Sequence, residues 1–98
     1  MLEDKQRKRN NGLELSMTYF VYFLSCADGT YYCGYTKDLT KRLVAHNNGT
    51  ASKYTRSRRP VKLIYSESHK TQLLAMRREI MLKKLSRKEK ANLIGLKE

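Results

Sequence analysis

The sequence is poor in cysteine, histidine and long apolar runs. Its 98 residues include two cysteines and two histidines, and the cysteines do not form a Cys-x-x-Cys pair. We therefore expect free thiols at Cys26 and Cys33 rather than a structural zinc site. The longest wholly apolar or aromatic run, residues 19–24, is much shorter than the roughly 20 residues that span a bilayer. No apolar segment follows the charged N-terminal residues, so the expected location is the cytoplasm, without export or membrane insertion.

Acidic residues are also scarce, and the resulting positive charge is confined to one part of the chain. The net charge is +12. Residues 1–36 carry four basic and four acidic side chains, whereas residues 37–98 carry seventeen basic and five acidic ones. A basic surface on one part of a small domain is typical of proteins that bind nucleic acid. An anionic membrane is the main alternative partner, and we expect nucleic acid.

Blocks of aromatic, β-branched and turn-forming residues predict one small α+β (mixed α/β) domain over residues 17–96. Residues 1–16 are polar with a basic cluster and are predicted to be a disordered extension. A three-stranded sheet with flanking helices, in the order β-β-α-β-α-α, is the simplest way to bury the apolar faces. The predicted strands are 19–25, 30–36 and 61–66, and the predicted helices are 38–48, 70–85 and a short last helix after a capping box at 86–89, with a basic loop at 50–60.

The predicted helices carry apolar residues at helical spacing, and these residues are expected to face the core. They are Leu39 and Leu43 in the first helix, Leu73, Met76 and Ile80 in the long helix with Leu74, Met81 and Leu85 as further candidates, and Leu93 and Ile94 in the last helix.

The loop between the first two strands decides whether two tyrosines can act together. A three-residue loop at residues 27–29 pairs Tyr22 with Gly34 and places Tyr22 and Tyr32 on one face of the sheet. A two-residue turn shifts the pairing by one residue and separates the tyrosines onto opposite faces. Both turns are chemically allowed. In the first register Gly34 leaves open space where a phosphate can approach the phenol of Tyr22. In the second, the tyrosines are packing residues of the sheet.

Three further side chains carry chemistry suited to a phosphodiester. Arg42 and His46 are one helical turn apart, so they share a face of the first helix. The guanidinium of Arg42 can bind phosphate oxygens and the imidazole of His46 can transfer a proton, although each is also an ordinary residue of a helix surface. Glu79 is an isolated acid in a basic helix. Its carboxylate either pairs with Lys83 or holds a cation, and one carboxylate with water and phosphate suits Mg²⁺.

Two tyrosine motifs in the strands resemble those of the GIY-YIG nuclease domain. Residues 20–22, Phe-Val-Tyr, stand where that family has Gly-Ile-Tyr, and residues 32–34, Tyr-Cys-Gly, stand where it has Tyr-Ile-Gly. The first motif keeps its tyrosine and lacks the glycine and the isoleucine. The resemblance covers about residues 18–94. It is strongest to small stand-alone bacterial members and to the nuclease domain of structure-specific endonuclease subunits.

The downstream residues match the same family. Arg42 matches its arginine, His46 matches a position held by Tyr or His, and Glu79 matches its metal-binding glutamate. The resemblance implies a monomeric endonuclease that hydrolyses nucleic acid, DNA in preference to RNA, with a single Mg²⁺ or Mn²⁺ ion at Glu79. The implied catalytic residues are Tyr22, Tyr32, Arg42 and His46, and the implied nucleic-acid-binding residues are Gly34, Lys53, Arg56, Arg58, Arg59, Arg77, Lys83, Lys84 and Asn92.

Two other functions keep the same scaffold without independent catalysis. One is a non-catalytic module that binds nucleic acid, and the other is a subunit that cuts only with a protein partner. Retained residues do not decide between them, because a fold does not fix a function.

Overall fold

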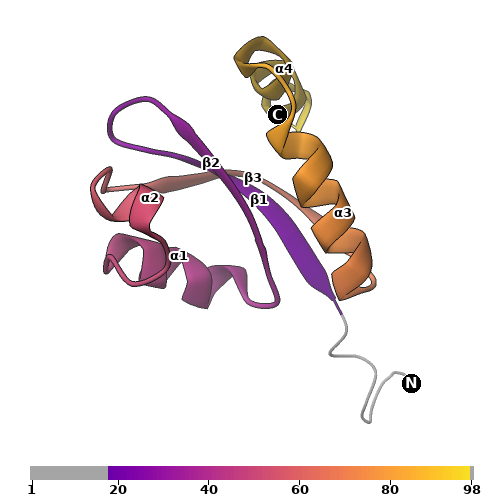
Figure 1. The fold of residues 1–98 in the computed structure, drawn as a ribbon, viewed down its shortest axis with the longest axis horizontal. Helices are drawn as coiled ribbons and strands as arrows, with labels where there is room; N and C mark the ends of the chain where they lie inside the picture. The colour runs from indigo at the N-terminus through magenta and orange to yellow at the C-terminus, as the bar shows by residue number, and fades with distance from the viewer. Residues whose placement is uncertain (1–17, 98) are drawn as a thin grey trace, which may run out of the picture.

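The computed structural model describes residues 18–97, which form a three-stranded sheet with four helices (Figure 1). The predicted α+β class is confirmed, and the segment predicted as a basic loop contains one short helix, α2. The predicted extension at 1–16 lies outside the described residues. The elements are β1 (Tyr19–Ser25), β2 (Tyr31–Thr36), α1 (Leu39–Asn47), α2 (Lys53–Arg56), β3 (Lys62–His69), α3 (Gln72–Lys83) and α4 (Arg87–Lys97).

The central strand of the sheet is β1, and it pairs antiparallel with β2 on one side and β3 on the other. Tyr22 lies opposite Gly34, and Leu24 lies opposite Tyr32, which is the register of the three-residue loop. Gly29 has a φ of +84°, so it supplies the left-handed residue that this loop requires. The register therefore places Tyr22 and Tyr32 on the same face.

The third strand is longer than predicted. It spans Lys62–His69 rather than residues 61–66, because Glu67 and Ser68 continue the pairing with β1. A bulge interrupts the ladder. Phe23 pairs with Tyr65 and the next residue, Leu24, pairs with Leu63, so one residue of β3 is skipped.

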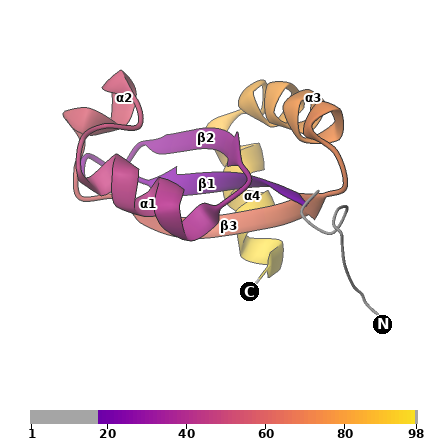
Figure 2. The same ribbon diagram turned by 90° about the horizontal axis from the view of Figure 1, so that it is seen from below.

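One face of the sheet is covered by α1 (Figure 2). Tyr22 and Leu24 project to this side and form a buried cluster with Val61, against which Leu39 and Leu43 of α1 pack. The predicted inward position of these two leucines is confirmed. The helix begins where the side chain of Asp38 accepts a hydrogen bond from the Lys41 amide, as expected for its N-cap.

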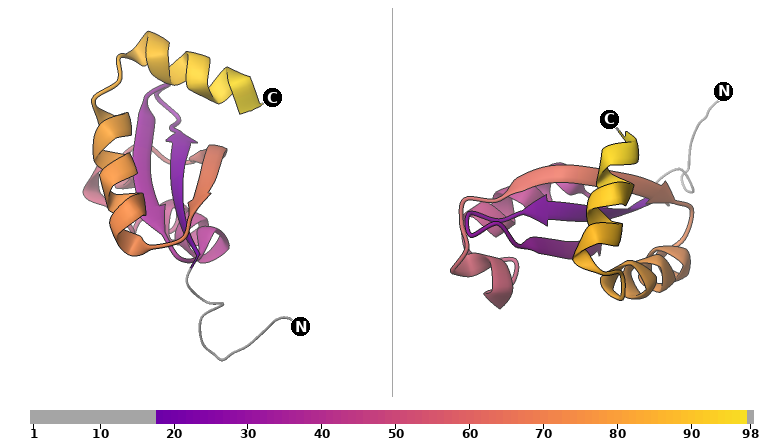
Figure 3. Two further views of the ribbon diagram at one scale, coloured as in Figure 1. Left: turned by 90° about the vertical axis from the view of Figure 1, so that its right-hand side faces the viewer. Right: turned by 90° about the horizontal axis from the view of Figure 1, so that it is seen from above.

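The opposite face is covered by α4, with α3 running beside β2 (Figures 2 and 3). Val21 and Phe23 project to this side and pack with Ala75, Leu82 and Ile94. The predicted capping box opens α4, because Ser86 and Glu89 exchange hydrogen bonds of 2.8 and 3.1 Å between backbone and side chain. Within residues 18–97, no helix has both the length and the apolar character needed to cross a membrane.

The prediction for the apolar face of α3 is wrong. Leu73 and Ile80 are 55% and 54% exposed, whereas Ala75 and Leu82 are 0% and 2% exposed. Ala75 and Leu82 are seven residues apart, so they lie on one side of the helix, and the small Ala75 side chain permits close approach to the sheet. The other predicted members Met76, Leu74 and Met81 are exposed as well, and Leu85 is partly buried against the core.

Polar contacts fix this rotation of α3. The guanidinium of Arg78 donates to both carboxylate oxygens of Glu67 on β3, at 2.7 and 3.3 Å. Glu67 also accepts from Tyr65 and bonds to His69, at 2.6 and 2.7 Å. Apolar side chains lie around most of the helix, so the hydrophobic pattern alone does not determine its rotation. The pairing of Arg78 with Glu67 stabilises the rotation that buries Ala75 and Leu82.

Candidate active site and its family

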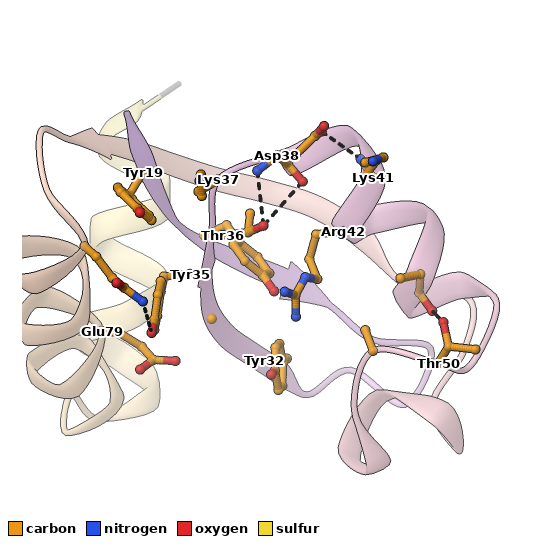
Figure 4. A pocket seen from close by; sticks show the side chains of 15 residues that line it. Tyr19, Tyr32, Tyr35, Thr36, Lys37, Asp38, Lys41, Arg42, Thr50 and Glu79 are labelled. Carbon is orange, nitrogen blue, oxygen red and sulfur yellow. Dashed lines mark hydrogen bonds between the residues drawn. The ribbon is translucent and has the colours of Figure 1, made fainter. Parts of the chain in front are cut away.

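An open cavity of about 810 Å³ lies beside the edge of β2. Its walls come from β1, β2, α1 and α3, and Figure 4 shows Arg42 and Tyr32 on one side with Glu79 across from them. The structure brings five of the predicted site residues to this cavity, although α1 and α3 pack against opposite faces of the sheet. These five are Tyr22, Tyr32, Gly34, Arg42 and Glu79.

Gly34 makes room for the phenol of Tyr22. A β-carbon at this position would lie 2.6 Å from the Tyr22 hydroxyl oxygen and 2.9 Å from its Cζ. The phenol therefore fills the space where a side chain at position 34 would lie, and Gly34 itself lines the cavity. Glycine is required here because the ring lies directly over the backbone of β2.

The hydroxyl of Tyr22 forms a buried hydrogen bond with His46. The hydroxyl oxygen of Tyr22 lies 2.9 Å from Nε2 of His46, and Nδ1 of His46 lies 2.8 Å from the hydroxyl of Thr55. Both His46 and Thr55 are fully buried, so the alternative interpretation of His46 as an ordinary surface histidine is wrong. His46 contacts the cavity through Tyr22 and does not line it.

Burial sets the protonation of this pair. It raises the pKa of Tyr22, and the neighbouring phenol of Tyr32 raises it further. Burial lowers the pKa of His46, and the positive charge of Arg42 lowers it again. Both side chains are therefore neutral near pH 7. Tyr22 is not a phenolate at rest, so it can accept a proton only if its own proton moves to His46.

Arg42 is half-buried on α1 and lines the cavity. Among residues 18–97 its guanidinium has no hydrogen bond or ion pair, so its donors face open space. A guanidinium held on a helix without an internal partner is suited to bind phosphate oxygens.

The carboxylate of Glu79 lies at the α3 wall of the cavity (Figure 4). It is 18% exposed and 3.3 Å from the Lys83 ammonium one helical turn away. No group of three or more metal-ligating side chains exists among residues 18–97, so a zinc site built from several protein ligands does not fit. A lone carboxylate at an open cavity does fit Mg²⁺, which keeps several waters and completes its shell with substrate phosphate.

Two of the arginines expected to bind nucleic acid also have partners within the protein. Arg58 donates to Asp28 at 3.0 Å and to the Tyr54 carbonyl at 2.8 Å, and its guanidinium lies 3.9 Å from the centre of the Tyr54 ring. Arg59 donates to the carbonyl of Arg56 at 2.8 Å. These contacts fasten α2 and the following loop to the hairpin, because Asp28 lies in the β1–β2 turn.

The other expected binding residues are distributed over several surfaces. Asn92 is exposed on α4, away from the cavity, because α4 covers the other face of the sheet. The remaining residues are exposed: Lys53 and Arg56 on α2, Arg77 and Lys83 on α3, and Lys84 just after it.

Several residues at the site escaped sequence reasoning. Thr55 and Ser52 complete the hydrogen bonds behind His46, with 2.9 Å between their hydroxyl oxygens. Lys37 and Lys41 add positive charge to the cavity wall. A Ser-x-x-Thr spacing indicates at most a helix N-cap, and no sequence signal indicates that Thr55 is buried against a histidine.

Comparison with known proteins identifies the family. Residues 18–92 match the model of the GIY-YIG catalytic domain. The chain belongs to the GIY-YIG family. This GIY-YIG domain is 46% identical over 77 residues to a UPF0213 protein of Staphylococcus saprophyticus, which covers 79% of this chain and 94% of the relative. It is 51% identical over 82 residues to a UPF0213 protein of Bacillus licheniformis, covering 84% of each chain.

A solved structure has the same fold as this GIY-YIG domain. The solution structure of the UPF0213 protein BH0048 from Bacillus halodurans is 42% identical in sequence, with a TM-score of 0.55, and the match covers 83% of this chain and 86% of that one. The family is nuclease-like, and the UPF0213 relatives carry no named function.

Proposed function

We propose that this protein is a metal-dependent endonuclease that hydrolyses phosphodiester bonds of nucleic acid, with DNA as the preferred substrate. The observation that carries the proposal is the meeting of Tyr22, Arg42 and Glu79 at one cavity, because these residues come from a strand and two helices far apart in the chain. A phenol, a guanidinium and a carboxylate are the groups needed to accept a proton, bind a phosphate and hold a cation.

Arg42 binds the scissile phosphate in this proposal. Its donors face the cavity from a rigid helix, so they can stabilise the negative charge that builds on the phosphate oxygens in the transition state. Lys37 and Lys41 lie on the same wall and add a favourable potential for a polyanion.

Tyr22 accepts the proton of the attacking water and passes its own proton to His46. A neutral phenol is a poor base, but a neutral imidazole 2.9 Å away can take the phenolic proton as the water proton arrives. Tyr32 orients the water, since its ring lies beside Tyr22 with 6.4 Å between the ring centres.

Glu79 would hold a Mg²⁺ or Mn²⁺ ion, with water and substrate phosphate as the other ligands. Such an ion would supply Lewis-acid stabilisation of the negative charge on the phosphate and the leaving group. Lys83 competes for the same carboxylate in the free protein, so metal binding is expected to be weak without substrate.

The test is cleavage of labelled single-stranded, nicked and branched DNA, with RNA in parallel, by the purified protein in Mg²⁺ and in excess chelator. Glu79→Gln is the control variant because it keeps the shape of the side chain and removes the charge. Metal-dependent cutting that the variant lacks supports the proposal. Equal cutting by both proteins contradicts it, and tight binding without any cutting indicates the non-catalytic module.

A further inference from the structure

A continuous line of hydrogen-bonding groups leads from the cavity, through His46 of α1, to the N-cap of α2. Tyr22 contacts Nε2 of His46 at 2.9 Å, Nδ1 of His46 contacts Thr55 at 2.8 Å, and Thr55 contacts Ser52 at 2.9 Å. The first three side chains are buried, and Ser52 is half-buried at the N-cap of α2. Ser52 therefore reaches solvent at one end, and at the other end Tyr22 lines the open cavity although it is only 1% exposed.

The line has two possible hydrogen-bond directions. With the proton of His46 on Nδ1, Tyr22 donates to Nε2, Nδ1 donates to Thr55 and Thr55 donates to Ser52. With the proton on Nε2, every bond is reversed and the Tyr22 hydroxyl must donate into the cavity. The Nδ1 form gives each buried donor a partner inside the protein and leaves solvent contact to Ser52 alone, so it is the favoured form.

We propose that Thr55 and Ser52 form the exit half of a proton wire that begins at Tyr22, with Thr55 as the positioning residue that selects the Nδ1–H form of His46. This inference rests on the proposed function, because the proton comes from the water that attacks the phosphate.

Each group along the wire gives up one proton and receives another. The O–H bond of the attacking water breaks and its proton joins Tyr22, while the phenolic proton moves to Nε2 of His46. The Nδ1 proton then moves to Thr55, the Thr55 proton moves to Ser52, and the Ser52 proton passes to solvent. When product leaves and water fills the cavity, the same transfers in reverse restore the Nδ1–H form.

Protonation and packing both support such a route. Burial disfavours the charged form of His46, so an imidazolium formed beside Arg42 readily loses its second proton. The short helix that carries Thr55 is fixed in place, because Arg58 ties it to Asp28 at 3.0 Å and the Thr55 amide donates to Ser52 at 3.1 Å. This also gives a reason why Arg58 is bound internally.

The experiment compares Thr55→Val, which removes the hydroxyl and keeps the shape, with Thr55→Ser, which keeps the hydroxyl. Nitrogen-15 NMR of the imidazole reports the form of His46 in each folded protein, without substrate. We expect Nδ1–H in the wild type and in Thr55→Ser. We expect Nε2–H in Thr55→Val, because the Nδ1–H form would leave a buried donor without an acceptor. Thr55→Ala carries the same expectation and replaces Thr55→Val if that variant does not fold.

Cleavage by the same proteins is the second measurement. Thr55→Val is expected to cut roughly tenfold or more slowly than Thr55→Ser; the effect is smaller than the roughly 100-fold or more that a direct acid or base contributes, because Thr55 acts through His46. An Nε2–H wild type, an unchanged imidazole in Thr55→Val, or equal cutting by the two variants would overturn the wire. If the imidazole responds as expected and no protein cuts any substrate, the proposed function has failed and the positioning by Thr55 stands.

Discussion

The close approach of Tyr22 to Gly34 makes Gly34→Ala the sharpest test of the site geometry. The added β-carbon would lie 2.6 Å from the Tyr22 hydroxyl and 3.1 Å from a ring carbon of Tyr32. Tyr22 is 1% exposed and bonded to His46, so its ring cannot move aside without losing that hydrogen bond. Overpacking costs about 1–3 kcal/mol and the lost bond about 1 kcal/mol, so we expect the free energy of unfolding to fall by about 2–4 kcal/mol.

Urea denaturation of single and double variants measures this effect. Tyr22→Phe removes the oxygen that the β-carbon would meet, so Gly34→Ala should cost about 1 kcal/mol less in the Tyr22→Phe background. Gly95→Ala is the matched control, since nothing lies within 4 Å of its β-carbon in α4. It should stabilise the protein by up to about 1 kcal/mol. A Gly34→Ala protein within about 0.5 kcal/mol of the wild type, the range of ordinary surface changes, would refute the reasoning.

Three further predictions concern charge. Glu79→Gln should abolish Mg²⁺-dependent cutting and bind DNA as tightly as the wild type or more tightly in fluorescence anisotropy; weaker binding would contradict this. Burial alone would raise the pKa of Glu67, but hydrogen bonds led by that of Arg78 leave it lowered. Glu67→Gln should therefore destabilise the protein at pH 7, and urea titrations should show the difference shrinking as the pH falls below about 4. A constant difference would oppose it. Replacing Lys53 and Arg56 by alanine should reduce the slope of log affinity against log salt by about 2, and an unchanged slope would exclude these contacts.

The hairpin was predictable because its turn chemistry is local, but its register was not. Residues 27–29 allowed two loops, and only the family resemblance, which requires both tyrosines on one face, favoured the register that Tyr22 and Gly34 adopt. The helix caps at Asp38 and Ser86 were predictable for the same reason, since each depends on residues within one turn.

The rotation of α3 was not predictable, because it depends on a residue distant in the sequence. Leu73 and Ile80 suggest one buried face and Ala75 and Leu82 another, and hydrophobic periodicity weights the larger side chains. The pairing of Arg78 with Glu67 on β3 decides between them. Such a contact cannot be read from helical spacing.

The burial of His46 escaped prediction for a related reason. A histidine near the end of a basic helix is usually exposed, and here its second partner, Thr55, comes from a four-residue helix in a segment of polar and basic residues. The pairing of Arg58 with Asp28 escaped prediction in the same way, because the two residues are 30 positions apart.

The two walls of the cavity stand on the same sheet. Leu39 and Leu43 fix α1 to one face of β1, and Ala75 and Leu82 fix α3 to the other. Both helices pack directly on the sheet, so we expect the width between Arg42 and Glu79 to be set by β1 and β2 and not to change as the distance between two domains does. For the proposed nucleic-acid substrate, we then expect the bending or unstacking that brings a phosphate between these walls to come from the nucleic acid, and the most deformable strands to enter most readily.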